Sequence, residues 1–206
     1  MKNETSAPRR RGRPPAFCRD DVLAKAAECF WRRGYEGTSI VDLTTAMGIT
    51  PQSLYSAFGS KADLYRETLK WYGAAFATLT EESLERPDTI VTLSAWVKTQ
   101  AMLFTDLTHP RGCMISTAVL GCAAENDQVA NMVANLRETT IFRLQKRLQR
   151  AKVEGELRSN ADPAALARFV GAIIQGMSVQ ARDGASRAEL MAIARLAEEE
   201  LLRYCA

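Results

Sequence analysis

The chain has 206 residues, of which 47% are hydrophobic and 25% are charged, and its formal net charge at pH 7 is +3. This composition supports a buried core and excludes a disordered or low-complexity chain, because it contains only twelve glycines and seven prolines. The charge is uneven, since residues 1–19 hold six Lys and Arg side chains against one Glu, and this favours a polyanionic partner at that end.

Several other classes of protein are disfavoured by the sequence. No apolar segment near the start resembles a signal peptide, and the longest apolar-rich run, 113–124, is too short to cross a bilayer. Five scattered cysteines form no C-x-x-C pair, and the single histidine, His109, accompanies no H-E-x-x-H or G-x-S-x-G motif. We therefore expect a cytoplasmic protein with no membrane partner, no metal, no cofactor and no enzyme activity.

The chain opens with a basic, proline-containing segment, 1–16, which we expect to be a flexible arm. Its Arg-Gly-Arg-Pro sequence resembles an AT-hook core, in which Arg11 and Arg13 would enter a narrow minor groove. The alternative is a solvated tail that adds only positive charge. A first helix is expected from about 20 to 33, with Gly34 as a suitable residue for its C-cap.

Two short helices joined by a tight turn are predicted next. Ser39 and Asp42 form an S-x-x-D capping box at the start of the first helix, and Gly48 suits the reversal of the chain after it. Thr50 is the N-cap of the second helix, followed by Pro51 at the first helical position. Such a pair is typical of a helix-turn-helix that lays its second helix in the major groove, although it also fits an ordinary corner of two helices.

Side-chain chemistry suggests how this unit would contact DNA. Gln52 and Ser53 suit base edges, since Gln can pair with adenine through two hydrogen bonds. Tyr55 and Lys61 suit phosphates, which the N-termini of helices also attract. The predicted DNA contacts are Arg11, Arg13, Ser39, Thr50, Gln52, Ser53, Tyr55, Ser56 and Lys61.

The rest of the chain is also predicted to be helical. A fourth helix opens at the S-x-x-D box of Ser60 and Asp63 and is expected to reach about residue 82. No segment alternates with the period of a strand, so we expect an all-α fold of about nine helices. The remaining helices are expected over about 88–107, 113–124, 127–155, 163–182 and 186–204.

Apolar and aromatic residues of these later helices suit a ligand cavity, although ordinary core packing explains each one alone. Cys113 is a further candidate, because Arg111 and a helix N-terminus would favour its thiolate. A disulfide between Cys113 and Cys122 within one helix is excluded, since the helical rise would separate them by about 13 Å. The alternative for Cys113 is a small buried residue. The candidate ligand-binding residues are Trp96, Phe104, Cys113 and Phe142.

The last two predicted helices carry wide apolar stripes, and Gly171 and Gly176 would allow close approach of a neighbouring backbone. These stripes could meet their symmetry mates in an isologous interface, or they could serve only the core of one chain. The predicted dimer interface contains Leu166, Phe169, Val170, Ile173, Ile174, Met177, Leu190, Ile193, Leu196 and Leu201.

Three stretches resemble the DNA-binding domain of the TetR/AcrR family of bacterial transcriptional regulators. They are A-x-x-x-F-W-x-x-G-Y-x-G-T-S over 26–39, V-D-L-x-x-x-M-G-I over 41–49 and S-L-Y-x-x-F-x-S-K-x-x-L over 53–64. The resemblance covers roughly residues 17–66, and one departure is Ala57, where the family often has His. It implies an all-helical homodimer with a DNA-binding domain over 17–64 and a helical effector-binding and dimerisation domain over 65–206.

The sequence therefore predicts a sequence-specific DNA-binding regulator, most often a repressor in this family. Its expected partners are double-stranded operator DNA, a second copy of the chain and an unknown small-molecule effector. A thiol-reactive effector is a second form of the same hypothesis. The alternatives are a helical adaptor and a non-specific DNA-binding protein without an effector.

Overall fold

The structure is a computed structural model that describes residues 17–76 and 81–206, so the predicted arm with Arg11 and Arg13 lies outside the described residues. Within this part the chain forms nine α-helices, a short 3-10 helix (Ala124–Asn126) and no extended strand, which confirms the predicted all-α fold. The helices are α1 (Arg19–Arg33), α2 (Ile40–Met47), α3 (Pro51–Phe58), α4 (Lys61–Ala75), α5 (Glu81–Glu85), α6 (Thr89–Phe104), α7 (Asp127–Val153), α8 (Pro163–Arg182) and α9 (Arg187–Leu202).

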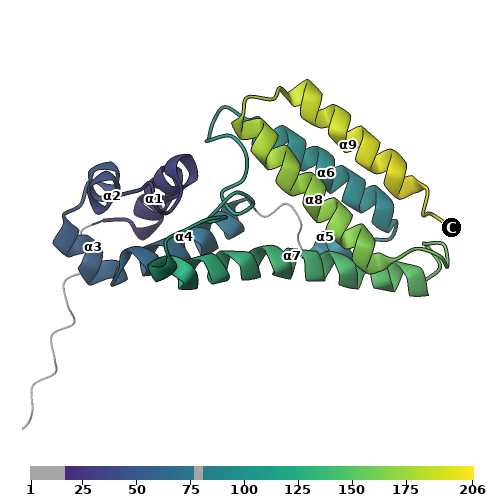
Figure 1. Ribbon diagram of the computed structural model, residues 1–206, viewed down its shortest axis with the longest axis horizontal. Coiled ribbons are helices and arrows are strands. Elements are labelled where there is room, and N and C mark those ends of the chain that lie inside the picture. Colours follow the sequence, from purple (N-terminus) through teal and green to yellow (C-terminus); the bar gives the residue numbers. More distant parts are fainter. Residues whose placement is uncertain (1–16, 77–80) are drawn as a thin grey trace, which may run out of the picture.

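The helices are arranged in a small head and a larger body (Figure 1). Helices α1, α2 and α3 gather at one end, whereas α6, α8 and α9 lie side by side at the other. Helix α1 packs mainly on α4, helix α6 on α9, and helix α7 on α8. Helix α7 has 27 residues and is therefore about 40 Å long, enough to run beneath both parts.

The head is assembled from locally encoded helix ends. The backbone N–H of Asp42 donates to Ser39 Oγ at 3.0 Å, and the Asp42 carboxylate accepts from the Ser39 N–H at 2.9 Å, which completes the predicted capping box. Gly48 ends α2 in the left-handed region, with φ 69° and ψ 33°. Because glycine adopts this conformation at no steric cost, the chain can reverse directly into α3.

Two hydrophobic clusters hold the molecule together. One joins α1 to α4 and includes Phe30, Leu54 and Tyr65, while the other lies among α6, α7, α8 and α9. The first cluster continues into the body through Met114 and Val133. The head is therefore packed against the start of α7 and the segment before it, and is not attached by a linker alone.

The predicted helix over 113–124 is wrong. Residues 114–119 form turns, the rest of 113–123 is irregular, and Val119 has a φ of 46°. The backbone N–H of Cys113 donates to Ser178 Oγ at 2.8 Å, and that of Met114 donates to Tyr72 Oη at 3.3 Å. These two side chains satisfy donors at the start of the segment, so Met114 and Ala118 are buried there without a helix around them.

The fourth helix also ends earlier than predicted. It was expected to reach about residue 82, but α4 ends at Ala75 and Phe76 has a φ of −113°. The Phe76 ring packs edge-on against Trp31 with centroids 5.3 Å apart, and edge-on against His109 at 5.2 Å. This aromatic packing fixes the end of α4 at the boundary between the head and the body.

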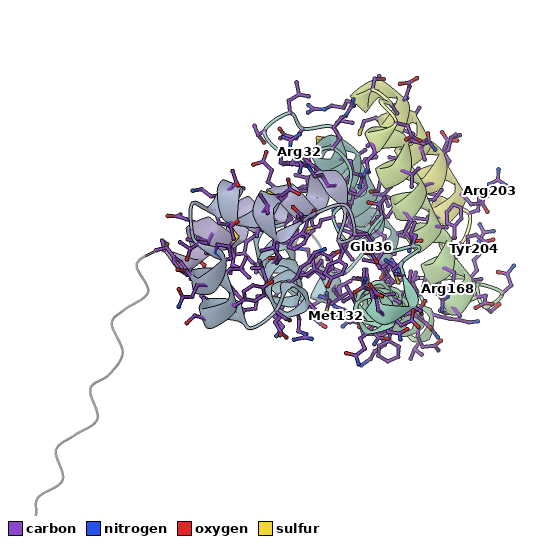
Figure 2. The ribbon with its side chains drawn as sticks, turned by 60° about the vertical axis from the view of Figure 1, so that its left-hand side comes forward. Arg32, Glu36, Met132, Arg168, Arg203 and Tyr204 are labelled. Atoms are coloured by element: carbon purple, nitrogen blue, oxygen red, sulfur yellow. The ribbon has the colours of Figure 1, made fainter. Side chains whose placement is uncertain are left out.

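Further polar contacts cross the same boundary. The Glu36 carboxylate accepts from the Ala123 N–H at 3.1 Å and from Asn126 Nδ2 at 2.7 Å, and Figure 2 labels it where the head meets the body. Arg182 donates to the Arg32 carbonyl at 3.4 Å. The head is therefore oriented by specific contacts with the body, in addition to its apolar packing.

Helix α8 is, among the described helices, the one long and apolar enough to span a membrane by length and composition. It packs against both α7 and α9, and 44% of its most apolar window is buried within the protein. This packing is typical of the core helix of a helical bundle.

Candidate nucleic-acid interface and ligand cavity

Helix α3 presents a polar face on an otherwise packed head. Its inner side is anchored by Leu54 and Phe58, which are buried in the first hydrophobic cluster. On the outer side, Gln52 and Ser56 are exposed, and Tyr55 is 48% exposed. The i, i+4 spacing of the anchors directs the intervening polar residues outward, where they can reach a groove of DNA.

The N-terminus of α3 is closed by its predicted cap. The Ser53 N–H donates to Thr50 Oγ1 at 3.2 Å, and the two hydroxyl oxygens are 3.0 Å apart. Ser53 is therefore engaged with Thr50 in this structure, whereas Gln52 has a free outward side chain. Exposed Ser39 lies at the N-terminus of α2. Both helix N-termini lie on the head, and each is capped by side chains of the chain itself, α3 by Thr50 and α2 by Ser39 with the Asp42 carboxylate.

Lys61 occupies the first position of α4, and its Nζ lies 4.3 Å from the centroid of the Tyr35 ring. Burial lowers the pKa of this ammonium, and nearby Glu36 opposes that shift. The Lys61 ammonium is therefore held over an aromatic ring at the N-terminus of α4. Such a held cation suits a phosphate better than a base edge, because it offers charge without a fixed donor pattern.

A cavity of about 320 Å³ lies where α4, α6, α7 and α8 meet the segment before α7. Its wall is largely aromatic and aliphatic, with a few hydroxyl, amide and guanidinium groups, and the described lining contains no Asp or Glu. Such a mixture is typical of a site for a small organic ligand. The aromatic and sulfur-bearing lining residues are Trp31, Tyr72, Phe76, Trp96, Phe104, His109 and Cys113.

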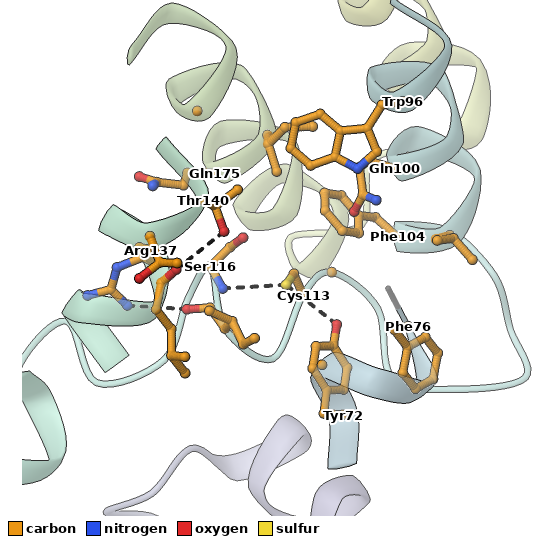
Figure 3. A pocket seen from close by; sticks show the side chains of 18 of the residues that line it. Tyr72, Phe76, Trp96, Gln100, Phe104, Cys113, Ser116, Arg137, Thr140 and Gln175 are labelled. Carbon is orange, nitrogen blue, oxygen red and sulfur yellow. Dashed lines mark hydrogen bonds between the residues drawn. The ribbon is translucent and has the colours of Figure 1, made fainter. Parts of the chain in front are cut away.

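Cys113 takes part in a hydrogen-bonded group at the cavity wall (Figure 3). The Tyr72 hydroxyl donates to Cys113 Sγ at 3.4 Å, and the Ser116 N–H approaches the same sulfur at 3.5 Å. Burial raises the pKa of the Tyr72 phenol, and the neighbouring Cys113 raises it further, so this hydroxyl keeps its proton. The sulfur is thus connected directly to α4.

The structure brings together three of the four predicted ligand residues. Trp96, Phe104 and Cys113 line the cavity, whereas Phe142 is 59% exposed on the outer side of α7 and lies outside it. Phe142 instead lies under the ammonium of Lys146, at 5.6 Å from the ring centroid. Because 113–124 is not a helix, neither the predicted helix N-terminus at Cys113 nor the predicted helical separation of Cys113 and Cys122 applies.

Trp31 and His109 are cavity residues that the sequence did not indicate. Trp31 directly follows Phe30 on α1, and neighbouring residues of a helix point in different directions. The periodic pattern of apolar residues that face the core of the head therefore includes Phe30 and leaves out Trp31. In the structure Phe30 and Trp31 are both buried, because Phe30 packs in the core of the head and Trp31 packs towards the body. The adjacent Phe-Trp pair was a usable signal, since two bulky neighbours on one helix require two apolar surroundings.

The predicted interface residues of α8 and α9 are divided between two environments. Leu166, Val170, Ile174, Met177, Leu190 and Leu201 are buried in the core of the single chain. Phe169, Ile173 and Ile193 are partly buried, and Leu196 is 66% exposed. The six buried residues therefore fit the alternative in which the apolar stripes serve the core of one chain. Only the second group leaves apolar surface for a partner.

No group of three or more His, Cys, Asp or Glu side chains within the described ranges is arranged to hold a metal ion.

Comparison with known proteins places these features in a family. Residues 22–68 match the family of bacterial regulatory proteins named tetR, and residues 91–196 match the tetracyclin repressor-like C-terminal domain. The chain is 36% identical over 186 residues to the HTH-type transcriptional repressor ComR of Escherichia coli K12, with 89% of each chain covered. The repressor BdcR of the same organism is 28% identical over 194 residues, or 92% of each chain.

Solved structures agree with this assignment. A cysteine mutant of the TetR family regulator CifR, in complex with 26-base-pair operator DNA, is 36% identical and superposes with a TM-score of 0.86. That match covers 91% of this chain and 98% of CifR. The protein described here therefore belongs to the TetR family of bacterial transcriptional regulators.

Proposed function

We propose that the protein is a dimeric transcriptional repressor that binds a specific operator and is released from it by a small molecule. The observation that carries the proposal is the polar outer face of α3, which is anchored by Leu54 and Phe58 and is left exposed by the described part of the chain. The names of ComR and BdcR as repressors, and the operator complex of CifR, support it. We place the protein in the cytoplasm, on the nucleoid when DNA is bound.

The operator contacts follow from the chemistry of the exposed residues. Gln52 would read a base, Tyr55 and Lys61 would hold phosphates, and Ser39 and Thr50 would add hydroxyl groups at helix N-termini. Ser53 and Ser56 would complete the surface, and the arm with Arg11 and Arg13 would add minor-groove or phosphate contacts. In a dimer, two copies of α3 would enter successive major grooves about 34 Å apart.

The dimer would form through the outward faces of α8 and α9. Phe169, Gly176 and Val179 follow one another on α8 at spacings of seven and three residues, and all keep some exposed surface. Leu196 is exposed on the adjacent helix α9. Pairing this apolar surface with its symmetry mate gives an isologous four-helix interface, with the buried residues of the predicted set supporting it from behind.

The cavity is the proposed effector site. It is lined by Trp31 from the head and by Trp96, Phe104 and Cys113 from the body, so a ligand would contact both. We assign residues 17–64 to the DNA-binding domain and residues 65–206 to the effector-binding and dimerisation domain. A thiol-reactive effector is a second candidate, favoured by the position of Cys113 in the wall. The coupling between the two binding sites is reciprocal. If the effector lowers the affinity for DNA by some factor, bound DNA must lower the affinity for the effector by the same factor.

Selection of bound sequences from randomised duplex DNA, with the purified full-length chain, tests the proposal. Enrichment of a palindrome with half-sites about one helical turn apart is the expected result. Binding that follows salt concentration without enriching any sequence would support a non-specific DNA-binding protein. Absence of DNA binding would support a helical adaptor.

A further inference from the structure

One polar contact between the head and the body starts from the turn between α1 and α2. Glu36 lies in this turn, and its Oε1 accepts from the Ala123 N–H at 3.1 Å and from Asn126 Nδ2 at 2.7 Å. Asn126 is the residue directly before α7. Hydrogen bonds to an ionised carboxylate are stronger than those between neutral groups. The head is therefore held at this point by a charged acceptor that receives two donors of the body.

The turn that carries Glu36 is fixed on the side of the head. The hydroxyl of Thr38, a fully buried residue, donates to the Gly34 carbonyl at 2.7 Å and closes the turn. Tyr35, directly before Glu36, is buried in the cluster of the head, and its ring centroid lies 4.3 Å from Nζ of Lys61. Because Glu36 is continuous with this packed turn, a displacement of its carboxylate displaces Tyr35 and Lys61 as well.

A second polar contact holds the head at another position. Arg182, the last residue of α8, donates to the Thr117 hydroxyl at 3.1 Å and to the Arg32 carbonyl at 3.4 Å. Arg32 lies in the last turn of α1, four residues before Glu36. The body therefore contacts the C-terminal end of α1 and the turn that follows it through two separate groups.

Apolar and polar contacts differ in how they constrain the angle of the head. The hydrophobic effect depends on the area removed from water and has no direction, whereas a hydrogen bond weakens steeply away from its preferred geometry. A small rotation of the head therefore changes the free energy of the shared apolar cluster less than it changes the hydrogen bonds of Glu36 and Arg182.

We propose that the contact of Glu36 with Ala123 and Asn126, supported by Arg182, positions each head and thereby determines which separation of the two half-sites the dimer accepts. The inference rests on the proposed function, because it requires two heads on one operator. One base pair of B-DNA shifts a half-site by about 3.4 Å and rotates it by about 35°. Twofold symmetry repeats a rotation of the head in the second subunit, so the separation of the two α3 helices depends strongly on this contact.

Asn126→Asp tests the inference from the body and leaves the surface of the head unchanged. It replaces the amide that donates to Glu36 by a second carboxylate. Aspartate is also a good residue for the N-cap of α7, where the Asn126 side chain makes no capping hydrogen bond. Asn131→Asp is the matched control, since it adds the same charge at an exposed position five residues further along α7.

Fluorescence anisotropy of the full-length proteins is measured with four duplexes. They are the selected palindrome, the same palindrome with one central base pair added or removed, and a single half-site. Relative to the control, Asn126→Asp should bind the selected palindrome about three- to tenfold more weakly and the two altered spacings with a smaller loss. The affinity for the single half-site should equal that of the control, because no residue of α3 has changed.

Arg182→Met keeps an apolar stem without the guanidinium, and it should weaken the preference for one spacing in the same way, even if Asn126→Asp does not fold. All proteins are compared at concentrations where sedimentation velocity shows dimers. A spacing preference as steep in the variants as in the control would overturn the inference, even with weaker binding to every duplex, because a lower folded fraction has that effect. An unchanged chain that selects no palindrome would instead contradict the proposed function.

Discussion

Lys61 and Gln52 both belong to the head, at the starts of α4 and α3, but they differ in the part of DNA that each can contact. Lys61→Ala removes one cation held over Tyr35, so it should weaken binding to all duplexes and reduce the slope of log affinity against log salt by about 0.9. Gln52→Ala should leave that slope unchanged and relax the preference at one base position. Salt-dependent fluorescence anisotropy with operator and unrelated duplexes measures both effects.

Lys146 provides a matched control for this prediction. Its ammonium also lies over an aromatic ring, that of Phe142, but it is on the body, on α7. Lys146→Ala should therefore leave DNA affinity and its salt slope as in the unchanged chain. An effect as large as that of Lys61→Ala would mean that net charge, and not the position of the cation, determines the binding.

At the scale of single elements, the capping box of α2 makes the stability of the helix-turn-helix depend on pH. Hydrogen bonds from the Ser39 hydroxyl and N–H, aided by Arg33, lower the pKa of Asp42 from its ordinary value of 3.8 to about 2. Since the folded-state pKa is depressed, this stabilisation is fully present above pH 4 or so and is lost as pH falls to about 2. Asp42→Asn should therefore reduce the free energy of unfolding at neutral pH, and the difference should vanish near pH 2 or so.

Urea unfolding of the two proteins across this pH range measures the difference. Ser39→Ala removes the hydroxyl that contributes most to the lowered pKa of Asp42, while the backbone N–H and Arg33 remain, so it should reduce the same pH-dependent part. The double variant should then lose little more than either single variant, because the two residues act as one unit. Fully additive losses would show that Asp42 stabilises the fold through other contacts.

The packing of α7 on α8 depends on the absence of a side chain at one position. A Cβ added to Gly171 would lie 2.1 Å from Cδ1 of Ile141, so Gly171→Ala must displace that side chain at the cavity wall. We expect a loss of about 1–3 kcal/mol in the free energy of unfolding. Gly73→Ala on α4 meets no atom of the described residues within 4 Å and should instead raise the free energy of unfolding by roughly 0.5–1 kcal/mol. Similar urea midpoints for the two variants would refute this account.

The elements also show which parts of the fold the sequence could predict. The two ends of α2 and the start of α3 were predicted correctly, because Ser39, Gly48 and Thr50 act on neighbouring backbone groups. The segment 113–123 was not predictable in this way, because Tyr72 and Ser178, which satisfy its first donors, lie about 42 and 65 residues away along the chain. The DNA-facing residues of α3 follow local periodicity, whereas the cavity is built from distant segments.

At the scale of the whole molecule, operator recognition by two heads requires a dimer. The apolar surface left by α8 and α9 includes Leu196, which is 66% exposed in the single chain. Leu196→Glu would place a carboxylate in the proposed interface twice, once from each subunit. Because a buried unpaired charge is costly, the dissociation constant of the dimer should rise by about a hundredfold or more. Sedimentation velocity over a concentration series measures this change.

Val153→Glu is the matched control, since Val153 is another exposed apolar residue, at the C-terminal end of α7. It should leave the dimer intact. Loss of the dimer in Leu196→Glu should also lower operator affinity, although no DNA contact has changed, because each head then binds one half-site alone. A Leu196→Glu protein that remains dimeric at the concentration of the control would place the interface on another face, and the spacing of the two α3 helices would have to be derived again from that face.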